Sequence, residues 1–158
     1  MTGSAAIILA RQLLQAMLAS SFGVVATFVV LMAEPLKNGE SHGGGIIAFV
    51  EQRISKPSQQ HGIIAAPSDL ANPMSWSDAK ATCDSLTLGG FNDWMLPDKA
   101  DLKRLFLSKK AIGKFQDTDY WSSSVFEPDS AWSQCFLNGK ENIRSRQSRL
   151  RVRPIRKF

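Results

Sequence analysis

The side chains in this chain that could do chemistry are few, and their spacing favours no reaction. The histidines, His42 and His61, lie in a polar segment and at the start of an apolar run, without a Ser/Asp or Cys partner at motif spacing. The cysteines, Cys83 and Cys135, lack the Cys/His spacing of a zinc site. We therefore expect no catalytic residue, no metal ligand and no cofactor.

The two cysteines leave a disulfide as an alternative. Cys83 and Cys135 would form a single bridge in an oxidising compartment. However, Cys83 falls on the apolar face of a predicted helix, where a free cysteine behaves as a small hydrophobe. We expect two free thiols.

Positive charge is concentrated at the C-terminus. The chain has a net charge of +5, and residues 140–158 hold eight Lys/Arg against one acid, Glu141. A basic terminus is found in proteins that bind nucleic acid, but no aromatic side chains interleave with these arginines for base stacking. We expect the arginines to alternate along a strand and form one solvated face, with no nucleic-acid partner.

Fixed landmarks and irregular positions alternate over the last forty residues. The landmarks are Tyr120-Trp121, Trp132, Asn138-Gly139 and Arg153-Pro154, whereas the residues between them follow neither a helical nor a strand period. A regular framework that carries irregular residues is typical of a binding surface on a rigid scaffold. This pattern favours recognition over catalysis.

Two helices are predicted in the middle of the chain. Ser75 can cap the first, with Asp78 at its N3 position; Trp76, Ala79, Cys83 and Leu86 recur on one face, and Gly89-Gly90 would end it. Asp98 can cap the second, with Asp101 in its first turn and Leu102, Leu105 and Phe106 inward. Residues 109–119 are expected to be an irregular loop.

Strand signals lie on both sides of these helices. Segregated helices and strands indicate an α+β fold rather than an alternating α/β one. The expected elements are a hairpin of residues 45–50 and 61–66, strands at 120–124, 131–136 and 149–156 in a short meander, and turns at 127–129 and 138–139.

The N-terminus has a different composition from the rest. Residues 12–33 are mainly apolar and acid-free, and they follow a lone Arg11. Residues 1–34 are predicted to be a signal peptide, a membrane anchor or a hydrophobic assembly helix, which keeps a membrane partner and an oligomer open. A linker at 35–42 would precede one domain at 43–158. We expect a secreted or membrane-anchored protein at the cell surface, with the virion or the cytoplasm as alternatives.

The landmarks together resemble a known family. Leu88 to Pro97 (LGGFNDWMLP), then Tyr-Trp-Ser-Ser, Ala-Trp, Asn-Gly and Val-Arg-Pro-Ile-Arg, are similar in order to the C-terminal domain of the Lcl collagen-like adhesin. That resemblance covers about residues 43–158 and implies a C-type-lectin-like fold, related to formylglycine-generating-enzyme-like domains. Those enzymes use a copper-binding cysteine pair near the C-terminus, where this chain has Cys135 alone, so we expect no enzyme.

The C-terminus also resembles the variable proteins of diversity-generating retroelements. In those proteins adenine-directed mutagenesis rewrites chosen codons, typically Asn codons, and the exposed variable side chains bind a ligand. The resemblance implies a ligand site at the positions whose residue types are reachable from an Asn codon: Ser133, Cys135, Leu137, Asn142, Ile143, Arg144, Ser148 and Leu150.

We accordingly expect a protein or glycan ligand on a cell or virus surface, bound without chemistry. A structural role, in which the N-terminal helix drives oligomerisation, is the alternative. Trp94, Trp121 and Trp132 are expected in the core rather than in a sugar site. Glu127-Pro128-Asp129 is similar to the calcium tripeptide of true C-type lectins, but it is expected to be a turn because its companion Trp-Asn-Asp is missing downstream.

Overall fold

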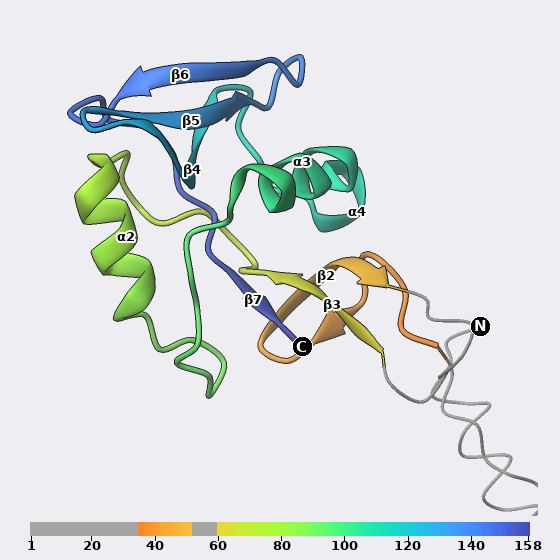
Figure 1. Cartoon of the computed structure of the whole chain (residues 1–158). Coiled ribbons are helices and arrows are strands. Elements are labelled where there is room, and N and C mark those ends of the chain that lie inside the picture. Colours follow the sequence, from red (N-terminus) through yellow and green to blue (C-terminus); the bar gives the residue numbers. More distant parts are fainter. Residues whose placement is uncertain (1–34, 52–59) are drawn as a thin grey trace, which may run out of the picture. The chain divides into compact units, whose positions relative to one another are not determined.

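The computed structural model describes residues 35–51 and 60–158, and these contain two antiparallel sheets (Figure 1). The first sheet has the order β1-β2-β3-β7, from β1 (Ser41–His42), β2 (Gly45–Glu51), β3 (His61–Ala65) and β7 (Ile155–Lys157). The second has the order β4-β5-β6, from β4 (Asp119–Glu127), β5 (Ser130–Cys135) and β6 (Glu141–Ser145). Together with the helices, this confirms the predicted α+β class.

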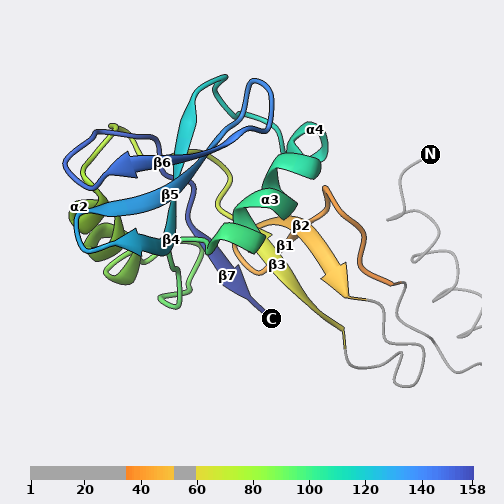
Figure 2. The same ribbon diagram turned by 45° about the horizontal axis from the view of Figure 1, so that its top comes forward.

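Both predicted helices form with the caps that the sequence indicates. In α2 (Trp76–Asp84) the Ser75 side chain accepts from the Asp78 N–H, and in α3 (Lys99–Leu107) the Asp98 side chain accepts from the Asp101 N–H. α2 ends at Ser85, before the predicted Gly89-Gly90 stop, and these glycines instead form a tight turn between Leu88 and Phe91. The segment predicted as a loop contains the short helix α4 (Lys109–Ile112). α2 and α3 flank β4 (Figure 2).

The C-terminal segment departs from the predicted meander. β6 supplies the third strand of the second sheet, although residues 141–145 carry no strand period, because β6 is an edge strand with mostly exposed side chains. Residues 149–154 instead run from one sheet to the other. Their backbone bridges Leu150 to Met74 and Arg151 to Tyr120, and β7 then pairs with β3.

Buried side chains of the two sheets and three described helices form the core. One cluster joins Leu102 and Leu105 of α3 with Tyr120, Phe136 and Ile155. Another packs Ala79 and Cys83 of α2 against Trp121, Ala131 and Val152. Trp94 and Trp121 are buried as predicted, and their indole N–H groups donate to the carbonyls of Leu88 and Met74. Trp132 is only half-buried, so its prediction as a core residue is wrong.

Two arginines of the C-terminal segment are buried, in contrast to the predicted solvated row. The Arg153 guanidinium donates to Asp69 Oδ1 at 2.7 Å and to the Lys114 carbonyl at 2.7 Å, and it lies over the Phe115 ring. The Tyr120 hydroxyl donates to the other Asp69 oxygen at 2.6 Å. Burial, together with this hydrogen bond, raises the pKa of Tyr120 above its ordinary value. The alternation of arginines along the sequence predicted exposed side chains. It contains no information about partners that are distant in the sequence.

Arg156, like Arg153, is held by an ion pair, a backbone hydrogen bond and an aromatic ring. Its guanidinium bonds both Asp93 oxygens at 2.7 and 3.0 Å, donates to the Gly43 carbonyl and lies over the Phe91 ring. The hydrogen bonds from Arg156 lower the pKa of the Asp93 carboxyl. Gly43 is beside β1, so the predicted linker segment 35–42 ends in a strand paired with β2.

The N-terminal predictions fall outside the described residues. This applies to the hydrophobic helix, the signal peptide and the membrane anchor of residues 1–34. Across residues 35–51 and 60–158, no helix has the length and apolarity that crossing a bilayer requires.

We expect the exchange of Arg153 for methionine to lower the free energy of unfolding by about 3–5 kcal/mol, because the Asp69 carboxylate would stay buried without its cation. Denaturant unfolding followed by tryptophan fluorescence measures this. Lys80→Met is the control, since its ion pair with Asp84 is half-exposed and contributes about 1 kcal/mol or less. Equal effects of the two substitutions would contradict the proposed role of Arg153.

The two thiols are free in the structure, and their environments differ. Cys83 is fully buried, and burial raises its pKa to about 12, whereas Cys135 is partly exposed. We therefore expect one thiol to react rapidly with a thiol reagent in the native chain and two to react in denaturant.

The fast reaction should disappear in Cys135→Ser. Two fast thiols in the native protein, or none in denaturant without a reductant, would show that this arrangement of the cysteines is wrong.

Candidate surface for ligand binding

A charged cluster centred on Asp119 lies on one face of the second sheet. Arg144 reaches across from β6 and places its Nε at 2.8 Å and its Nη2 at 2.7 Å from Asp119 Oδ2. The Asn142 amide lies 3.5 Å from Asp119 Oδ1, and Cys135 is the strand partner of Asp119. Strand alternation explains why these side chains share one face, because Arg144 and Asn142 are two residues apart.

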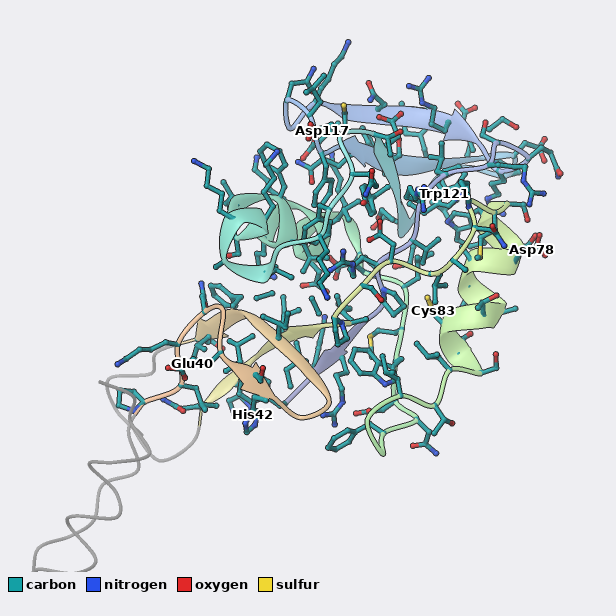
Figure 3. All side chains as sticks on the ribbon, turned by 180° about the vertical axis from the view of Figure 1, so that it is seen from behind. Glu40, His42, Asp78, Cys83, Asp117 and Trp121 are labelled. Carbon is teal, nitrogen blue, oxygen red and sulfur yellow. The ribbon has the colours of Figure 1, made fainter. Side chains whose placement is uncertain are left out.

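A hollow of about 540 Å³ adjoins this cluster. It is lined by residues 116–118, residues 149–151 and Pro73. The two surfaces are joined through the backbone, since Thr118 precedes Asp119 and the Arg151 N–H donates to the Asp119 carbonyl. Asp117, on the loop that leads into β4, lies at the end of the second sheet (Figure 3).

The basic side chains of the C-terminus divide into paired and unpaired groups. Arg144 is held by Asp119, and Arg146 lies over the Trp76 ring at 4.3 Å. Within the described part of the chain, Arg149 and Arg151 have no ion pair or side-chain hydrogen bond, and both line the hollow. Two guanidiniums of this kind can bind a carboxylate, sulfate or phosphate group without first breaking a bond within the protein.

We call the Asp119 cluster and the hollow together the recognition surface. Four of the eight predicted ligand-site residues belong to it: Cys135, Asn142, Arg144 and Leu150. Leu150 also packs partly against the core cluster that contains Trp121.

The other four predicted positions lie elsewhere. Ser133 is 2% exposed and its hydroxyl is directed to the Asn142 carbonyl, so its side chain is not available at the surface. Ile143 is opposite Trp132 on the other face of the sheet, and Leu137 is in the turn after β5. Ser148 is half-buried in the loop after β6, where its N–H donates to the Ser145 carbonyl.

No sequence motif predicted a site at Asp119, at residues 116–118, or at Arg149 and Arg151. The first group carried a weak signal, because Asp117 and Asp119 stand directly before the Tyr120-Trp121 landmark. The arginines were counted as basic residues, but nothing local distinguishes the free Arg149 and Arg151 from the buried Arg153. Only the tertiary contacts separate them.

Glu127-Pro128-Asp129 forms the predicted turn, since Pro128 and Asp129 connect β4 to β5. In the described parts of the chain, no three His, Cys, Asp or Glu side chains gather as metal ligands would.

The comparison with known families gives the same family as the one that the sequence landmarks resemble. No curated protein matches the chain. Residues 55–156, which are more than half of the chain, match the model of the Lcl C-terminal domain. The matched segment includes both capped helices, the second sheet and the ion pairs Arg153–Asp69 and Arg156–Asp93. The chain therefore belongs to the Lcl C-terminal domain family.

Proposed function

We propose that this domain is a recognition module that binds a ligand through the recognition surface. The observation that carries the proposal is the position of Arg149 and Arg151, two guanidiniums that are unpaired among the described residues and lie at a hollow of about 540 Å³. Their neighbours in sequence, Arg153 and Arg156, are buried and fully engaged. Two like charges beside each other at the hollow repel, and neither guanidinium has a partner among the described residues that would reduce this repulsion. A ligand with an anionic group would offset it.

The scaffold beneath this surface supports binding without conformational change. Trp121 and Tyr120 are fully buried on opposite faces of β4, and their polar atoms bond to Met74 and Asp69. A rigid support of this kind lowers the entropy lost on association. We propose that the ligand is a protein or glycan on a cell or virus surface, and that binding involves no catalysis and no cofactor.

We further propose that the fold is C-type-lectin-like and that the C-terminal positions vary through a diversity-generating retroelement. Support comes from the recognition surface itself, where Cys135, Asn142 and Arg144 lie beside Asp119 and are at least partly accessible. Exposed side chains tolerate exchange at small cost in stability. A secreted or membrane-anchored location fits such a role.

An array of glycans and proteins screened with the full chain should give ligands whose affinity depends on the hollow. We expect Arg149→Ala with Arg151→Ala to weaken binding by at least about thirtyfold, as hot-spot arginines do, with unchanged unfolding. Lys103→Ala is the matched control, because Lys103 is also an exposed cation, but lies on α3. Equal binding of wild type and double variant would overturn the proposed site.

The retroelement proposal has its own test at the locus. A near-duplicate of the coding region for the C-terminus should lie nearby, with adenines at the codons of Cys135, Asn142, Arg144 and Leu150. Sequencing of the locus decides this, and a locus without the duplicate would remove variability from the proposal while leaving ligand binding intact.

A further inference from the structure

β6 is an edge strand, and all but one of its outer backbone groups have no partner in the described structure. The pairs Cys135–Lys140 and Asp129–Arg146 are hydrogen-bonded, and both follow the register of the β5–β6 ladder. Alternation along an antiparallel ladder therefore directs the N–H and C=O groups of Asn142 and Arg144 toward β5. The corresponding groups of Glu141, Ile143 and Ser145 are directed outward, where only the Ser145 carbonyl is bonded, by the Ser148 N–H.

The other edges of the two sheets are protected against pairing in ways that β6 is not. β1 has two residues, and β4 is interrupted by register shifts on both sides of Val125. β7 has three residues, and Met95 bonds to Ile155 in both directions. β6 keeps a continuous register over its five residues and contains no proline or glycine. Such an edge is a template for another strand.

The sequence of β6 is complementary to itself in the antiparallel direction. Pairing about Ile143 would place Ile143 opposite Ile143 of a second copy, Glu141 opposite Ser145, and Asn142 opposite Arg144. No like charges face each other within these five residues. Lys140 and Arg146 would meet just outside β6, so repulsion limits the pairing to the strand itself.

An exposed apolar surface continues from this edge. Ile143 is 42% exposed and pairs with the half-buried Trp132, whose ring lies edge-to-face with Phe126. Phe126 is 48% exposed on β4. A second Ile143 placed at the edge would extend this apolar row and cover part of it.

We propose that β6 pairs antiparallel with β6 of a second copy, which joins two three-stranded sheets into one of six strands. The pairing uses backbone groups at the edge and leaves Asn142 and Arg144 on their face of the sheet. The dimer therefore presents two recognition surfaces side by side, an arrangement that raises avidity for a repeated ligand. The pairing itself does not depend on the proposed function.

Cysteine cross-linking of the full chain tests the pairing in a Cys135→Ser background, where the remaining Cys83 is buried. We expect Ile143→Cys to form a covalent dimer under mild oxidation, because paired residues across a two-fold axis lie within reach of a disulfide. Leu107→Cys is the control for random collision, since Leu107 is 73% exposed on α3. Ile143→Cys should react at least about tenfold faster.

A second pair of variants tests the register. Glu141→Cys and Ser145→Cys chains should cross-link when mixed and much less when each is oxidised alone, because residue 141 faces residue 145 of the other copy. The experiment compares cross-linking rates of cysteine variants that differ only in the position of the cysteine. Association through residues 1–34 would therefore raise the rates of all the variants together. Equal rates for positions 143 and 107, or equal yields for mixed and separate chains, would overturn the proposal.

Discussion

The Asp69 carboxylate links two segments that adjoin the first sheet to the start of a strand in the second sheet. It comes from the loop after β3, accepts from Tyr120 at the start of β4, and pairs with Arg153 ahead of β7. Arg153 in turn donates to the carbonyls of Ala66 and Lys114. Because a buried charge left without its partner is costly, these contacts stabilise the packing of the two sheets and the loop before β4 against one another.

This constraint also positions the recognition surface. Tyr120 follows Asp119 directly, so fixing the Tyr120 hydroxyl fixes the residue that holds Arg144 and Asn142. Arg151 stands two residues before Arg153, and its backbone pairs with that of Tyr120. Both segments that supply the recognition surface therefore also carry residues that hold the fold together.

Local signals in the sequence predicted the elements that depend on local physics. Ser75 with Asp78 and Asp98 with Asp101 predicted two helix starts, because a cap is made within four residues. The hairpin of β2 and β3 followed from continuous apolar runs. β6 and the divided roles of Arg149 and Arg153 were not predictable in this way, since an edge strand lacks a buried face and the partner of Arg153 lies 84 positions away.

The central claim is that the scaffold supplies stability while the recognition surface is free to change. A library that randomises positions of the recognition surface, with unfolding measured for individual members, tests it most directly; the positions are Cys135, Asn142, Arg144, Arg149 and Arg151. Our account predicts that most members unfold cooperatively within about 1 kcal/mol of the parent. A library in which most members lose cooperative unfolding would show that these residues hold the fold together, and would contradict the account.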